Sequence, residues 1–122
     1  MNKKRLMEIA DIIENQSLVA MSFNMSSWRL ERECDTMACI AGWTCVKYAP
    51  KRYRQVPMDD VMRLARDCLN LTKEQARDLF VPKFPGLDRY SFKYYRRITP
   101  KQAADTIRKF VETGEIVWTL PV

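Results

Sequence analysis

The sequence contains no histidine, and only three of its 122 residues are glycine. Histidine is the most frequent general base, the usual partner of a nucleophilic serine or cysteine, and a very common transition-metal ligand. With so few glycines, the chain also has no glycine-rich loop of the kind that cradles phosphates. These absences disfavour catalysis, so we expect a protein that is not an enzyme and that uses no cofactor.

The chain also lacks a long apolar run. Charged residues make up 30% of it, and no stretch approaches the roughly 20 apolar residues of a membrane-spanning helix. The basic start resembles that of a signal peptide, but Glu8, Asp11 and Glu14 interrupt any hydrophobic region behind it. We therefore expect a cytoplasmic protein without membrane contact. Its length and its 47% of hydrophobic residues fit one domain, residues 1–122, with one core.

Four cysteines invite comparison with a metal site, but their spacing is irregular. Structural zinc sites begin from close cysteine pairs, and no such pair stands at each end of this set, which is Cys34, Cys39, Cys45 and Cys68. We favour buried, reduced core thiols and no metal. One alternative is a redox-sensitive pair of Cys34 and Cys39, because a helix start beside them would stabilise thiolate. A metal protein is the other alternative.

The stretch from Thr36 to Val46 carries no charged residue. Thr36 can cap a helix, and a helix that is apolar on every side is buried on every side. We therefore expect Thr36–Tyr48 to form a central core helix that Pro50 ends. Gly42 costs about 1 kcal/mol inside a helix, which indicates that another helix crosses closely at this point.

Helix signals flank this centre on both sides. Apolar residues at helical spacing predict an amphipathic helix over residues 3–15, and Pro57 begins a second over residues 57–69. Capping boxes formed by Thr72 with Gln75, and by Thr99 with Gln102, predict two further helix starts, and Gly114 is a suitable C-cap.

The remaining segments have weaker signals. Residues 16–33 read as a largely ordered connector with a short strand or helical turn, and residues 51–56 as a basic loop. Residues 82–98 read as irregular, and 115–120 as a short strand or an extended tail. The fold class expected is mainly α: a single compact bundle of about five helices around a buried central helix, with one short C-terminal strand as an option.

Positive charge is concentrated in two segments of a chain whose net charge is +6. Four cations and no acid lie between Lys47 and Arg54, and five cations and no acid lie between Arg89 and Lys101. Cations neutralise phosphates and tyrosines stack on unpaired bases, whereas tyrosine and arginine also dominate protein interfaces. Three alternatives stay open: a nucleic acid, an acidic host protein, or a solvated surface whose tyrosines pack inward. The candidate contact residues are Lys51, Arg52, Tyr53, Arg54, Arg89, Tyr90, Lys93, Tyr94, Tyr95, Arg96 and Arg97.

Three motifs together resemble a family of small uncharacterised phage and bacterial proteins. They are Cys34-Asp-Thr-Met-Ala-Cys-Ile-Ala-Gly42, Leu-x-Leu-Thr-x-x-Gln-Ala-x-x-Leu-Phe80, and Thr99-Pro-x-Gln-Ala-Ala104. The family pattern is Cys-Gly-Thr-x-x-Cys-Ile-x-Gly, and this chain has Asp35 in place of its first glycine. The resemblance implies a mobile-element accessory protein that binds host machinery, which includes inhibitors of a host or defence complex. It implies no catalytic residue.

Overall fold

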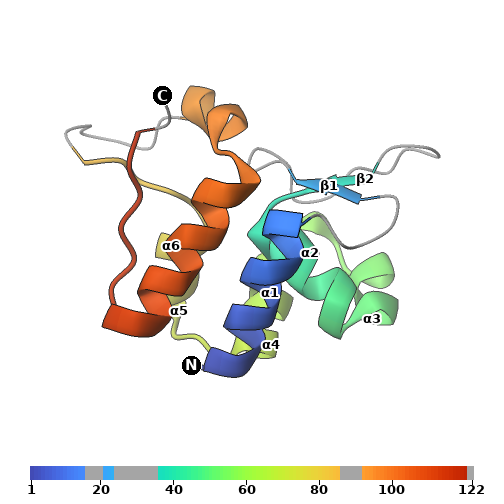
Figure 1. Cartoon of the computed structure of the whole chain (residues 1–122). Coiled ribbons are helices and arrows are strands. Elements are labelled where there is room, and N and C mark those ends of the chain that lie inside the picture. The colour runs from blue at the N-terminus through green and yellow to red at the C-terminus, as the bar shows by residue number, and fades with distance from the viewer. Residues whose placement is uncertain (16–20, 24–35, 86–91, 121–122) are drawn as a thin grey trace.

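The computed structural model describes residues 1–15, 21–23, 36–85 and 92–120, and this part of the chain is mainly helical (Figure 1). The mainly α class predicted from the sequence is therefore confirmed. The elements in chain order are α1 (Lys3–Asn15), β1 (Met21–Phe23), β2 (Thr36–Ala38), α2 (Ile40–Tyr48), α3 (Pro50–Gln55), α4 (Met58–Leu69), α5 (Lys73–Phe80), the 3₁₀ helix η1 (Phe92–Arg97) and α6 (Pro100–Thr113).

Helix α2 is the centre of the bundle. It contacts α1, α3, α4, α5 and β2, and every residue from Ile40 to Cys45 is buried. Trp43, the largest of them, is completely shielded from solvent. This confirms the prediction of a central helix that is covered on all sides.

The start of the central helix was predicted wrongly. Residues Thr36–Ala38 form a strand instead, which pairs in parallel with Met21–Phe23, and Thr36 lies opposite Met21. Backbone groups that bond to a neighbouring strand cannot also close helical turns, so the helix begins only at Ile40. Cys39 therefore occupies the N-cap position, where it has extended backbone geometry and makes no side-chain cap.

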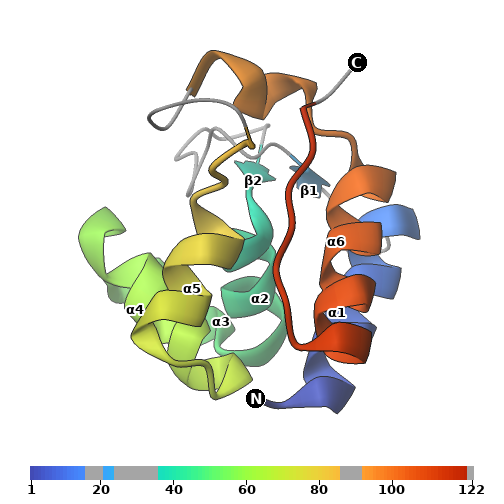
Figure 2. The ribbon, with the colours of Figure 1, turned by 90° about the vertical axis from the view of Figure 1, so that its left-hand side faces the viewer.

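Helices α1 and α6 lie side by side and run in opposite directions (Figures 1 and 2). Asn2 caps α1, because its Oδ1 accepts a hydrogen bond of 3.1 Å from the backbone N–H of Arg5. The predicted apolar stripe of α1 is confirmed, since all four of its members have no exposed surface: Leu6, Ile9, Ala10 and Ile13.

The predicted helix ends are confirmed in most details. Thr72 and Gln75 form a complete capping box at the start of α5, and Gly114 ends α6 in the left-handed region with φ 79°. The second box is only half formed. Thr99 Oγ1 accepts from the backbone N–H of Gln102 at 3.0 Å, but the Gln102 amide donates to the carbonyl of Thr119 at 2.7 Å. Gln102 therefore holds the C-terminal tail instead of closing its own helix start.

The tail over residues 115–120 is extended but pairs with no strand in the part of the chain that is described. The optional C-terminal strand was therefore wrong, and the extended tail is confirmed. Figure 2 shows the tail running back beside α6 towards the upper end of the molecule. Trp118 is 2% exposed, and its Nε1 donates to the carbonyl of Asp78 on α5 at 2.9 Å. The tail thus ties α5 to α6.

Over the described ranges, none of the helices has both the length and the apolar character that a bilayer span requires.

Candidate functional site

The first basic segment is a short helix and not the loop that was predicted. Helix α2 ends at Tyr48, Ala49 breaks the helical geometry, and Pro50 begins α3 in its first turn. Proline suits this position because its fixed φ is already helical and its missing N–H has no helical partner there. Its three cations, Lys51, Arg52 and Arg54, are all exposed to solvent.

Tyr53 belongs to the same helix but is only 6% exposed. Its ring belongs to the hydrophobic core, so it cannot stack on a base. The prediction of Tyr53 as a contact residue is therefore corrected. In a helix, successive side chains point in different directions, so Tyr53 can face the core while its basic neighbours stay exposed. The loop predicted for this segment did not indicate this difference.

The exposed cations around α3 have no carboxylate partner among the described residues. Elsewhere in that part of the chain, arginines and lysines repeatedly pair with acids: Arg63 with Asp60, Arg77 with Asp78, and Arg108 with Glu14. Among the described residues no such pair involves the exposed cations of the segment 47–54, so no described carboxylate compensates their charge. These cations are Lys47, Lys51, Arg52 and Arg54.

The second basic segment also turns a predicted contact residue inward. Tyr95 is 3% exposed, its hydroxyl donates to the carbonyl of Pro82 at 2.6 Å, and its ring meets Phe84 edge-on with 6.2 Å between centroids. Tyr95 is thus a core residue, which corrects its prediction as a contact residue. Tyr94 is half-buried, and the guanidinium of the exposed Arg97 lies 5.8 Å from its ring centroid.

Part of the second segment lies outside the described residues. This holds for Arg89 and Tyr90 entirely, and for the side chains of Lys93 and Arg96. The described parts of the two basic segments do not adjoin: both ribbon views place η1 at the upper end of the molecule and α3 lower down, beside α2 (Figures 1 and 2). The described parts of the two basic segments, α3 and η1, therefore lie apart from each other.

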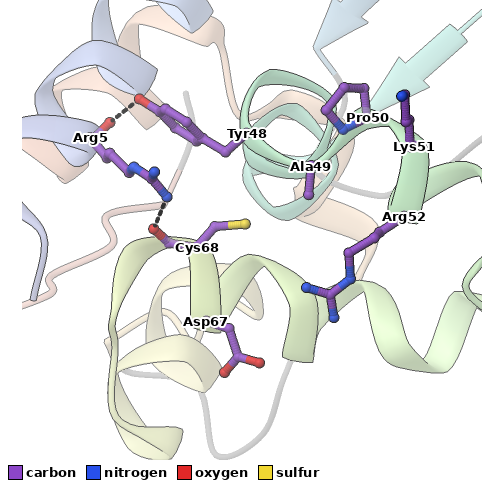
Figure 3. A pocket seen from close by; sticks show the side chains of 8 residues that line it. All are labelled: Arg5, Tyr48, Ala49, Pro50, Lys51, Arg52, Asp67 and Cys68. Carbon is purple, nitrogen blue, oxygen red and sulfur yellow. Dashed lines mark hydrogen bonds between the residues drawn. The ribbon is translucent and has the colours of Figure 1, made fainter.

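A surface cavity of about 590 Å³ opens beside α3 (Figure 3). It brings together the first turn of α1, the α2–α3 junction and the end of α4. No sequence pattern predicts that these elements meet, because Arg5 and Cys68 are 63 positions apart and belong to no shared motif. The residues that line the cavity are Arg5, Tyr48, Ala49, Pro50, Lys51, Arg52, Asp67 and Cys68.

Arg5 is held firmly at the wall of this cavity. Its Nη1 donates to the carbonyl of Cys68 at 2.9 Å, and its Cζ lies 4.4 Å from the centroid of the Tyr48 ring. The first contact satisfies a carbonyl at the negative end of α4, and the second is a cation–π contact. The Tyr48 hydroxyl donates to Glu8 Oε2 at 3.1 Å, and burial together with this hydrogen bond raises the pKa of Tyr48 to about 12.

The thiols of the described cysteines are not activated. Burial raises the pKa of Cys39 to about 11, although the backbone N–H groups of Ala41 and Gly42 act in the opposite direction. Burial also raises the pKa of Cys45, whose Sγ lies 3.5 Å from the carbonyl of Val61, and that of Cys68. The helix start at Cys39 is thus outweighed by burial, which argues against a reactive thiol there.

No candidate metal site is found among the described residues. Cys34 lies outside the described part of the chain, and within that part no three histidine, cysteine or acidic side chains gather where they could hold a metal ion. Comparisons with protein-family models, with curated proteins and with solved structures give no match to this chain.

Proposed function

We propose that this protein is a non-enzymatic nucleic-acid-binding protein that contacts the phosphate backbone through the exposed cations of the segment 47–54, with Lys47 at the end of α2 and the others on α3. The observation that supports this proposal is the uncompensated charge of the segment 47–54, where four exposed cations have no acidic partner among the described residues. Cations of this kind release counterions from nucleic acids on binding, which is the main source of affinity for the backbone.

The burial of two tyrosines bears on whether the proposed ligand is single-stranded or duplex nucleic acid. Because the rings of Tyr53 and Tyr95 lie in the core, they do not supply the stacking platform that single-stranded binding requires. The exposed cations of the segment 47–54 fit contacts to phosphates and not the reading of bases. We therefore favour a duplex, bound with little sequence preference, in the accessory role that the phage resemblance implies.

The test is the salt dependence of binding to a short labelled DNA duplex, followed by fluorescence anisotropy. Four phosphate contacts predict a loss of affinity on the order of a hundredfold between about 50 and 200 mM salt. Changing Arg52 and Arg54 to glutamine should weaken binding and reduce the salt slope by about one per residue. The matched control is Arg63→Gln on α4, which removes the same charge from a cation already paired with Asp60. Absence of binding, or binding that ignores salt, would contradict the proposal.

An acidic host protein is the second candidate. It is favoured by the neighbouring side chains of Arg97 and Tyr94, since arginine and tyrosine are enriched among interface hot spots. Affinity purification from host lysate, with and without nuclease, separates the two candidates. A partner that survives nuclease and is lost on Arg97→Glu supports a protein target, such as a host or defence complex.

A further inference from the structure

The cavity beside α3 is lined by more positive than negative charge. Arg5, Lys51 and Arg52 contribute three cations, and Asp67 is the one carboxylate among its lining residues. Asp67 also lies 3.6 Å from Nε of Arg66, outside the cavity lining, which offsets part of its charge. An anion that entered the cavity would therefore meet a net positive wall.

Two guanidinium groups flank the centre of this cavity. In Figure 3 the side chain of Cys68 projects between Arg5 on one side and Arg52 on the other. Burial raises the pKa of the Cys68 thiol, and the charges of both arginines act in the opposite direction, which favours an anion. A negative group that takes the place beside this sulfur would interact with the same two cations.

The two arginines differ in how they are prepared for binding. Arg5 is fixed by the Cys68 carbonyl and the Tyr48 ring, and this hydrogen bond uses only one of the several N–H donors of its guanidinium. Arg52 is exposed and forms no ion pair with a described residue. One side of the cavity is thus preorganised, and the other is free to close on a ligand.

We propose that this cavity binds a phosphate group between the guanidinium groups of Arg5 and Arg52, with Lys51 at its rim. Guanidinium groups match the oxygens of phosphate in pairs, and their planar shape favours such contacts over those of a lysine. The volume of about 590 Å³ lies within the usual range for small-molecule sites, so a sugar or nucleoside attached to the phosphate also has room. The phosphate belongs either to a small phosphate monoester or to a nucleic acid. In the second case the inference rests on the function proposed above.

Cys68 supplies a direct reporter of occupancy. The full chain is alkylated with iodoacetamide in inorganic phosphate and in chloride of equal ionic strength, and modification of each cysteine is followed by peptide mass mapping. A phosphate beside Sγ should shield the thiol and disfavour its thiolate, so alkylation of Cys68 should slow in a saturable manner. Equal rates in the two salts would overturn the proposal.

Two variants assign the effect to the cavity. Arg52→Gln should raise the phosphate concentration for half protection about tenfold, because a charge-assisted contact is lost. Arg63→Gln removes the same charge from α4 outside the cavity and should leave that concentration unchanged. Both side chains are exposed, so the fold is expected to survive, and circular dichroism checks it. An equal effect of the two substitutions would overturn the assignment.

Two further ligands separate this inference from the proposed function. If adenosine monophosphate protects Cys68 but the DNA duplex neither binds nor protects it, the cavity is a small-molecule site and the proposed function fails alone. If the duplex binds by anisotropy while neither it nor inorganic phosphate protects Cys68, the cavity inference fails and the function stands. Arg54→Gln sharpens the distinction, because Arg54 does not line the cavity. This substitution should weaken the binding of the duplex and leave the protection of Cys68 by adenosine monophosphate unchanged.

Discussion

Arg108 of α6 is paired with Glu14 of α1 across the interface of these helices, with 2.7 Å between Arg108 Nη1 and Glu14 Oε1. The same guanidinium reaches Asp11 Oδ1 through Nη2 at 2.8 Å. One side chain of α6 thus forms ion pairs with two residues of α1. These hydrogen bonds raise the pKa of Arg108 above its usual value.

We expect Arg108→Met to lower the free energy of unfolding by about 1 kcal/mol, the upper end for pairs that solvent still reaches. The difference should shrink in high salt, which screens the pair. Urea denaturation measures both effects. The control is Arg77→Met, whose pair with Asp78 is more exposed and should contribute almost nothing. Equal losses in the two variants would show that Arg108 contributes no special link.

Trp118 anchors the C-terminal tail, because its ring is buried and its Nε1 is bonded to α5. Trp118→Ala should therefore lower the free energy of unfolding by about 3–5 kcal/mol. Leu120→Ala, two residues along the same tail, removes a side chain that is 42% exposed and should cost no more than about 0.5 kcal/mol. Urea denaturation of both variants is the measurement, and similar small losses would mean that the tail does not hold α5.

Tyr95 is expected to act on stability and not on binding. Tyr95→Phe removes the donor to the buried Pro82 carbonyl and should cost about 1–3 kcal/mol of unfolding free energy. The affinity for a DNA duplex should stay at the wild-type value, because the hydroxyl points into the core. A variant that kept its stability but lost affinity would return Tyr95 to the contact surface.

The sequence predicted best those features that depend on neighbouring residues. The stripe of α1 and the capping box at Thr72 are local, and both are confirmed. The strand at Thr36 depends on a partner strand elsewhere in the chain, and no local pattern announced it. Gln102 likewise had a correct local pattern, but the distant Thr119 took its side chain.

The candidate site shows the same division. The charge of the segment 47–54 is visible in the sequence, because it is a matter of composition. The inward turn of Tyr53 depends on α3 packing beside α2, and the place of Arg5 depends on the meeting of α1 with α4. Those contacts join residues far apart in the chain, so sequence reasoning found the cations of α3 and missed the cavity beside them.

Gly42 is the third residue of the buried helix α2, which packs against α4, α1 and α5. Alanine is the better helix former by about 1 kcal/mol, but an added methyl group in a tightly packed core costs about 1–3 kcal/mol. We expect the second effect to win, so Gly42→Ala should lower the melting temperature. A higher melting temperature, measured by circular dichroism, would show that no neighbour approaches closely at this residue.

Tyr48 should make stability fall at high pH. Burial and the hydrogen bond to Glu8 raise its pKa from 10.0 to about 12, so the folded state keeps a proton that the unfolded state releases between these values. Below the unfolded pKa both states are protonated and Tyr48 adds no pH dependence; as the pH rises towards the folded pKa, its contribution to stability is lost. Buried thiols also lower the stability of the folded protein over a similar pH range, since the pKa of Cys39 is raised to about 11. Tyr48→Phe retains those thiols and removes only the tyrosine hydroxyl. The unfolding free energy of this variant should therefore fall less steeply with pH than that of the wild type, as measured by urea denaturation over this range. Parallel curves would mean that the Tyr48 hydroxyl ionises equally easily in both states.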